Sequence, residues 1–148
     1  MRMTEEKRRG IDFVTGYRRY TDKLSYINEQ MFFINRMLLT AKDNFGEKDM
    51  RYVTLLKERQ ELLFRRACCA GAREVIDQTV KRLPSPERQV IERYYIHGDG
   101  HRAAEELMEQ LGFEKTHIYR LRDRALRRIG EIVADEHLDV TLTVLRET

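Results

Sequence analysis

The sequence is poor in the residues from which turns and cross-links are built. Its 148 residues include only 2 prolines and 8 glycines, which leaves little material for the many turns of an all-β fold. The two cysteines, Cys68 and Cys69, are adjacent and belong to no Cys-x-x-Cys spacing, so neither a disulfide framework nor a zinc ribbon is indicated. This use of cysteine fits a reducing compartment, and we expect a cytoplasmic protein.

Long apolar segments are also absent. No apolar run approaches the ~18 residues of a membrane-spanning helix, so no membrane partner is expected. The first ten residues carry charge without a following apolar stretch, so we expect no signal peptide there. With 41% hydrophobic and 36% charged residues, the sequence predicts a soluble all-α protein of one domain or two small ones.

Two long amphipathic stretches come first, at roughly 4–43 and 48–82. Apolar residues recur along both in steps of three, four and seven, as on one face of a helix. Two long helices with a short connection predict an antiparallel helical hairpin over residues 1–83. Such a hairpin cannot hide all its apolar surface alone, so we expect an oligomerisation or interaction region and a homo-oligomer, most simply a dimer.

The sequence Leu83-Pro84-Ser85-Pro86 marks a boundary. Pro84 disfavours a helical conformation at the preceding residue, so a helix should end there. After the boundary, residues 84–135 are predicted to form a second domain with helices at about 86–97, 101–111 and 114–134.

The tail, residues 136–148, has a different pattern. Its apolar residues alternate with polar ones: Leu138, Val140, Leu142 and Val144. A period of two predicts a short C-terminal strand. Since no partner strand is evident in this chain, the strand would pair with the tail of a second subunit, or the tail would be disordered.

A single glycine, Gly112, stands in the short connection between two of the predicted helices. Leu107 and Leu111 lie one turn apart on the first, and Gly112 follows where a helix end requires a positive φ. Ile118 and Leu121 continue at helical spacing on the second. This is the spacing of a helix-turn-helix, whose second helix enters the major groove of double-stranded DNA.

The charge of that second helix points to the same ligand. From Phe113 to Gly130, six basic residues stand against two acidic ones, a net charge of +4. A basic run on a helix is often only a solvated face. Because these side chains lie on and just after the predicted recognition helix, a surface that contacts phosphates is the better interpretation.

Several short motifs follow one another in order between residues 83 and 129. They are Leu83-Pro84, Glu87-Arg88 with Val90-Ile91, Glu105-Glu106-Leu107, Leu111-Gly112-Phe113, Ile118-Tyr119-Arg120 and Arg124-Ala125-Leu126-Arg127. In this order they resemble region 4 of the sigma-70 family of transcription factors. They are similar, more closely still, to small phage and prophage regulators of the ArpU and RinA type.

The resemblance implies a DNA-binding regulator of transcription, of phage or mobile-element origin, and a role for each matching residue. Positions that face bases are matched by Lys115, Thr116, Tyr119 and Arg120. Flanking positions near the DNA backbone are matched by His117 and Arg124, and phosphate-contacting positions on supporting helices by Arg88 and Arg102. Further along the helix, Arg127 and Arg128 lie where it would leave the bases and meet the backbone. RNA polymerase is a further candidate partner, because region 4 contacts it.

Other function classes stay open. A small terminase subunit for DNA packaging also joins a helix-turn-helix to a helical oligomerisation part, but forms rings. A region 4 mimic would keep the fold and bind RNA polymerase or an anti-sigma factor instead of DNA. A polar turn is favoured over a metal site at His97, Asp99 and His101, since no further ligand is evident. No grouping of nucleophile and base predicts an enzyme, and we expect no cofactor.

Overall fold

The computed structural model describes residues 3–98 and 100–147. They form helices α1 (Glu5–Phe45), α2 (Met50–Val80) and α3 (Ser85–Ile91), the π-helical turn η1 (Glu92–Ile96), and helices α4 (Ala103–Leu111), α5 (Lys115–Glu136) and α6 (Leu138–Glu147). The predicted all-α class is confirmed, since every regular element in this part of the chain is helical. None of the helices found in these ranges is both long and apolar enough to cross a membrane.

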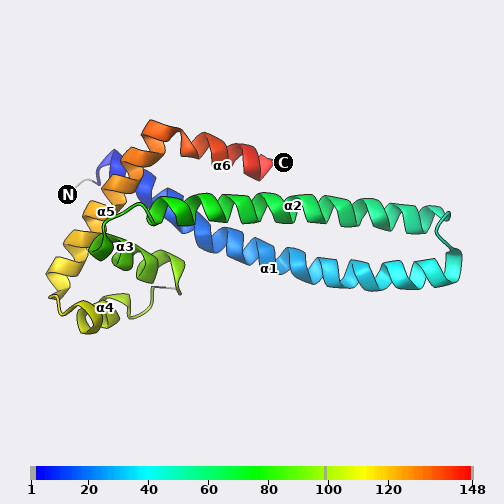
Figure 1. The fold of residues 1–148 in the computed structure, drawn as a ribbon, viewed down its shortest axis with the longest axis horizontal. Helices are drawn as coiled ribbons and strands as arrows, with labels where there is room; N and C mark the ends of the chain where they lie inside the picture. The colour runs from blue at the N-terminus through cyan, green and yellow to red at the C-terminus, as the bar shows by residue number, and fades with distance from the viewer. Residues whose placement is uncertain (1–2, 99, 148) are drawn as a thin grey trace.

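Helices α1 and α2 run antiparallel, side by side, and extend together away from the other helices (Figure 1). Each begins at a side chain that accepts a backbone hydrogen bond, Thr4 from Lys7 N at 3.2 Å and Asp49 from Arg51 N at 2.8 Å. The chain reverses direction after Gly46, whose φ of 86° favours glycine. The outer part of this helical hairpin is joined by an apolar cluster of Ile27, Met31, Ile34, Leu38 and Leu62.

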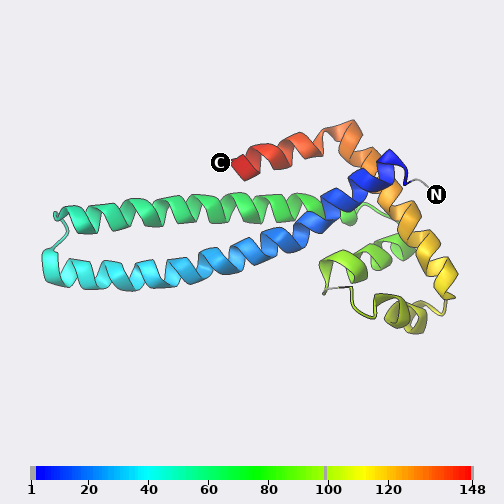
Figure 2. The ribbon, with the colours of Figure 1, turned by 180° about the vertical axis from the view of Figure 1, so that it is seen from behind.

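Helix α5 lies across the first turns of α1, as the view from behind shows (Figure 2). A glycine stands on each side of this crossing: Gly10 of α1 faces the backbone of Leu126, and Gly130 of α5 faces the backbone of Glu6. A Cβ atom at Gly130 would lie 2.6 Å from the Glu6 carbonyl carbon and nearer still to its oxygen. The two backbones therefore approach to a distance that only glycine permits at these positions.

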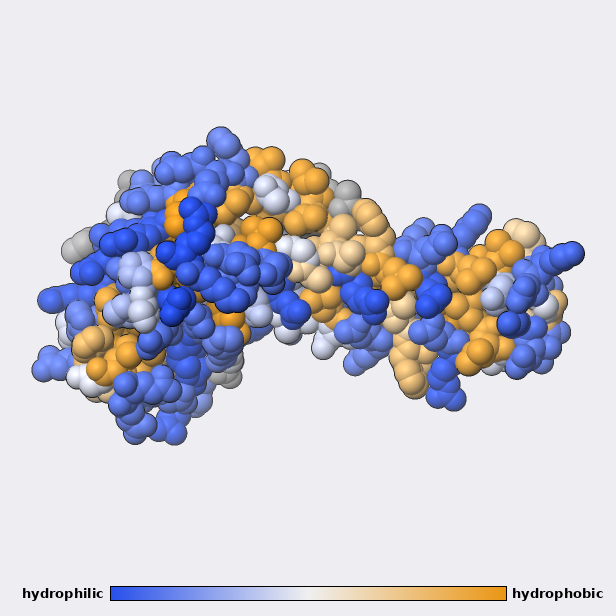
Figure 3. Space-filling model, in the orientation of Figure 1, coloured by the Kyte–Doolittle hydropathy of each residue, from blue (hydrophilic) through white to orange (hydrophobic). Residues whose placement is uncertain are grey.

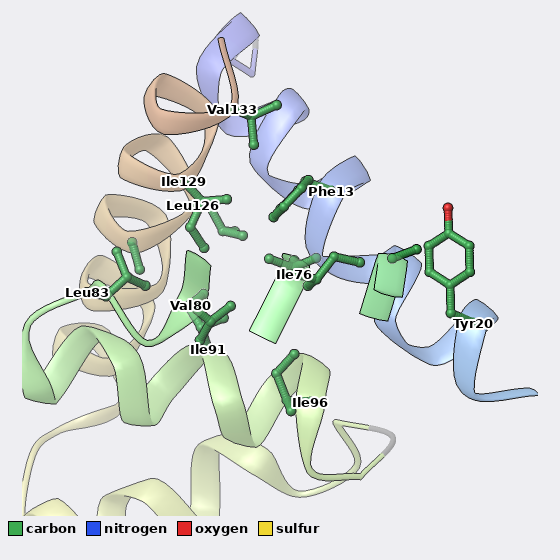
Figure 4. Close-up of a cluster of buried hydrophobic side chains, with 13 residues drawn as sticks. Phe13, Tyr20, Ile76, Val80, Leu83, Ile91, Ile96, Leu126, Ile129 and Val133 are labelled. Carbon is green, nitrogen blue, oxygen red and sulfur yellow. The ribbon is translucent and has the colours of Figure 1, made fainter. Parts of the chain in front are cut away.

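One core joins the base of the hairpin to the C-terminal helices (Figure 4). Side chains from five elements point into the same interior, among them Phe13, Ile76, Val80, Ile91, Ile96, Leu126, Ile129 and Val133. Full burial of one such side chain contributes about 1.5–3 kcal/mol. Residues 1–83 and 84–135 consequently meet in a shared core, which fixes the hairpin against α5.

The predicted C-terminal strand is wrong, because residues 138–147 form helix α6. Leu138, Leu142 and Leu145 pack against the main core, whereas Val140 and Val144 are 56% and 58% exposed. The three leucines are spaced four and then three residues apart, as on one face of a helix. In so short a segment the same sequence also fits the alternation expected of a strand. A helix pairs its backbone groups internally, which an isolated strand cannot do. Thr148, the last residue of the predicted tail, lies outside the described residues.

Candidate nucleic-acid interface

The connection between α4 and α5 sets the direction of α5. Gly112 adopts a left-handed conformation, with φ 69° and ψ 19°, and its N–H donates to the Met108 carbonyl at 2.9 Å. Helix α5 then begins at Lys115. Leu107 and Ile118, on the two sides of this turn, are 0% exposed and share a cluster with Val90 and Leu121. The first turns of α5 are thus anchored on one side and open on the other.

The open side carries most of the predicted site. All eight predicted residues on α5 are exposed: Lys115, Thr116, His117, Tyr119, Arg120, Arg124, Arg127 and Arg128. Thr116, Arg120 and Arg127 follow one another at helical spacing, four and seven residues apart, and we call them the outer ridge. No ion pair joins the outer ridge to any other described residue, so its two guanidinium groups are available to a ligand.

One flank of the outer ridge is aromatic. The guanidinium of Arg122 lies over the rings of Tyr94 and Tyr119, 4.9 and 5.0 Å from their centroids. Lys115 Nζ lies 5.9 Å from the Tyr119 centroid and 3.9 Å from the Glu105 carboxylate. Partial burial raises the pKa of the Tyr94 hydroxyl. Stacking from Arg122 therefore holds Tyr119 in place beside the ridge.

The other flank contains a buried acid. Glu87 of α3 is 3% exposed, and its carboxylate lies 3.2 Å from Arg128 Nε and 3.7 Å from Arg124 Nη1. Both arginines remain about half exposed, so each retains donors that face solvent. On this flank, His117 meets the ring of Phe113 edge to face at 4.6 Å. Arg124 and Arg128 therefore hold α3 against α5 as well as contributing positive charge.

Arg88 and Arg102 lie on other elements, on α3 and immediately before α4. Arg88 Nε is 3.4 Å from the carboxylate of Glu92, one turn further along the chain. Arg102 is exposed in a left-handed conformation, φ 59°, immediately before α4. The nine residues of α4 span about 13 Å and separate Arg102 from the turn at Gly112.

The structure adds basic residues that the sequence pattern did not suggest. Lys7 Nζ lies 2.8 Å from Asp123 Oδ1, which offsets an acidic charge beside the outer ridge. Arg9 donates to the Gly130 carbonyl at 3.4 Å, and Arg8 is exposed next to it. These residues are more than one hundred positions from α5 in the sequence, so no local pattern could have placed them there.

In the polar turn before α4, His97 lies next to an acidic residue of η1. His97 Nε2 lies 3.1 Å from the carboxylate of Glu92, while Asp99 lies outside the described residues. Within the part of the chain that is described, no three His, Cys, Asp or Glu side chains come together in a way that could hold a metal ion. On α2, burial raises the pKa of the Cys69 thiol, which lowers its thiolate fraction.

The chain matches no family model, no curated protein and no solved structure.

Proposed function

We propose that the protein is a sequence-specific DNA-binding regulator of transcription, in which α4, the turn at Gly112 and α5 act as a helix-turn-helix. The observation that carries this proposal is the outer ridge: Thr116, Arg120 and Arg127 stand exposed on a helix anchored at Ile118. A helix about as wide as the major groove can insert such a ridge between the two DNA backbones. The resemblance to sigma-70 region 4 supports this reading and a phage origin.

The residues divide into two roles. Arg120 can bind O6 and N7 of guanine with both arms of its guanidinium, and Thr116 can contact a thymine methyl group. Lys115, Arg127 and the exposed arms of Arg124 and Arg128 would contact phosphates. If four phosphates are neutralised, log K should fall with log salt at a slope of roughly −3.6.

A salt titration with matched variants tests this division. Arg120→Ala should weaken binding to a selected site by about 5- to 150-fold, the equivalent of 1–3 kcal/mol, because one bidentate base contact is lost. Arg66→Ala removes an arginine of α2 that is also exposed, far along the chain from the outer ridge, and should leave binding unchanged. Equal binding by the wild type and both variants would contradict the proposed role of α5.

A second candidate has one observation in its favour. The helix-turn-helix segment also exposes acidic side chains: Glu105, 3.9 Å from Lys115 Nζ, Glu109 on α4 and Glu114 just before α5. Mixed charge suits a protein surface better than DNA, because carboxylates repel phosphates. A region 4 mimic that binds RNA polymerase or an anti-sigma factor would therefore keep this fold, and Arg120→Ala would then leave DNA binding, already absent, unchanged.

The regulator is proposed to act as a homo-oligomer, most simply a dimer. A single helix-turn-helix reads only a few base pairs, and two of them supply useful specificity. A ring of many subunits would instead favour the DNA-packaging class, in which a small terminase subunit joins a helix-turn-helix to a helical oligomerisation part.

A further inference from the structure

The outer half of the hairpin exposes large apolar side chains far from the proposed DNA-binding end. Apolar atoms are visible along this part of the hairpin on the face seen in Figure 3. The exposed residues are Tyr26, Phe32, Phe33, Met37, Leu39, Phe45, Met50 and Phe64, between 44% and 70% accessible. Isolated exposed apolar residues are ordinary, but so many on one pair of helices indicate a surface that is covered by something else.

A continuous groove runs between α1 and α2 along this outer half. One stretch, of about 360 Å³, is lined by Gln30, Phe33, Met37, Glu58, Glu61 and Arg65, among others. The next stretch toward the tip, of about 320 Å³, shares Met37 and continues to Phe45 and Arg51. Toward the base, the stretch that shares Gln30 and Arg65 is also lined by Leu145 of α6.

Helix α6 packs beside the stretch of this groove nearest the hairpin base. Leu142 and Leu145 pack an apolar helix face against the hairpin base, and Leu145 also lines the groove. Among the described residues, only α1 and α2 line the two outer stretches of the groove. A second helical element of similar width can therefore occupy the outer stretch without displacing α6.

We propose that the occupant is the outer hairpin of a second copy of this chain, packed end for end so that the two hairpins form a four-helix bundle. The inference deepens the dimer of the proposed function by naming its surface. Turned end for end, two hairpins set α1 against α1 and α2 against α2. The α1 side of the groove carries Tyr26, Phe33 and Met37 beside polar residues such as Gln30 and Arg36, so the large apolar side chains of the two copies can meet along α1.

Charge on the other wall fits the same arrangement. The α2 wall carries Glu58 and Glu61 together with Arg51 and Arg65. A reversed copy can therefore bring acids beside bases, as in the e and g positions of coiled coils. Side chains of a single charge along α2 would repel those of the second copy, whereas α2 carries both charges and can form ion pairs with the α2 helix of the second copy.

The exposed area is of the size that a dimer needs. Tyr26, Phe33, Met37 and Phe45 are each about half exposed, which amounts to roughly 400 Å² of apolar surface for each copy. A standard interface buries about 800 Å² on each partner, somewhat more than half of it apolar. The groove therefore supplies close to the expected apolar share.

Light scattering coupled to gel filtration tests the proposal without DNA, so its failure would leave the DNA-binding proposal standing. The wild type should have twice the 17.8 kDa chain mass. Phe33→Glu and Met37→Glu, at exposed positions, should keep the helical circular dichroism and raise the dimer dissociation constant at least ~100-fold. Val140→Glu, an equally exposed apolar position on α6 outside the groove, should remain dimeric.

Several outcomes would overturn the proposal. A monomeric wild type, a larger ring, a dimer that survives both glutamate variants, or a dimer lost in Val140→Glu would each contradict it. Small-angle scattering then tests the orientation, since an end-for-end dimer is clearly longer than one chain. A dimer no longer than one chain would rule out the end-for-end arrangement.

Discussion

Replacing Gly130 by alanine should disrupt the close backbone contact between α1 and α5 and destabilise the protein. The added methyl carbon would lie 2.6 Å from the Glu6 carbonyl carbon and 3.0 Å from its Cα, both of them backbone atoms. Neither atom belongs to a flexible side chain that can turn aside, so α1 must move away from α5. Overpacking of a tight contact costs about 1–3 kcal/mol, and a backbone-to-backbone clash belongs at the upper end.

The higher helix propensity of alanine partly offsets the clash, so a second glycine without close neighbours serves as a control. Alanine is favoured over glycine inside a helix by about 0.5–1 kcal/mol. At Gly71 on α2 the nearest atom to an added Cβ is the Leu145 Cδ1 at 4.0 Å, an ordinary contact. Gly71→Ala should therefore stabilise the protein slightly, whereas Gly130→Ala should destabilise it by about 2–2.5 kcal/mol after this gain is subtracted.

Thermal unfolding followed by circular dichroism measures both variants. For a chain of this size, 1 kcal/mol corresponds to about 2–4 °C, so Gly130→Ala should lower Tm by roughly 4–10 °C. Gly10→Ala, on the other side of the crossing, should behave like Gly130→Ala, since its Cβ would lie 2.8 Å from the Leu126 carbonyl carbon. If Gly130→Ala melted at or above the wild-type temperature, α1 and α5 would not cross in this way.

Two further predictions concern charged groups. Arg128→Ala removes the nearest basic partner of the buried Glu87 carboxylate and should lower the free energy of unfolding by about 1–3 kcal/mol. Arg127→Ala, on the outer ridge, should leave the free energy of unfolding unchanged. Equal urea midpoints for the two variants would contradict a structural role of Arg128. The hydrogen bond from Arg93 lowers the pKa of Glu106 below its usual 4.5 in the folded protein. The stability that this hydrogen bond contributes is therefore complete above pH 4.5 and is lost as the pH falls through the lowered pKa. Urea unfolding of Glu106→Gln should therefore show a smaller loss of stability on acidification below pH 4.5 than the wild type, and an unchanged loss would refute the pairing.

Local patterns were sufficient for the helices before residue 137 and for the left-handed conformation at Gly112. Steps of three and four located the helices, and a glycine after Leu111 indicated a left-handed helix end, which the structure shows with φ 69°. Each of these features depends on residues within a few positions of one another. The outward placement of Thr116 and Arg120 follows from the same periodicity once Ile118 is assigned to the buried side.

Features that depend on contacts between distant segments could not be predicted in this way. The alternating tail satisfied the strand period, and only the core at the hairpin base decides that Leu138, Leu142 and Leu145 face inward on a helix. Likewise, nothing in the residues next to Glu87 distinguishes a buried acid from an exposed one. Its burial between α3 and α5 shows that Arg128 has a structural role as well.

The most direct test of the proposed function is selection of duplexes from random DNA by the purified protein at about 150 mM salt, beside Arg120→Ala. We expect the wild type to enrich a short shared motif and the variant to lose it, because Arg120 stands on the exposed outer ridge of α5. Failure of the wild type to enrich any sequence above bulk DNA would contradict a sequence-specific regulator and direct the search to protein partners of the same surface.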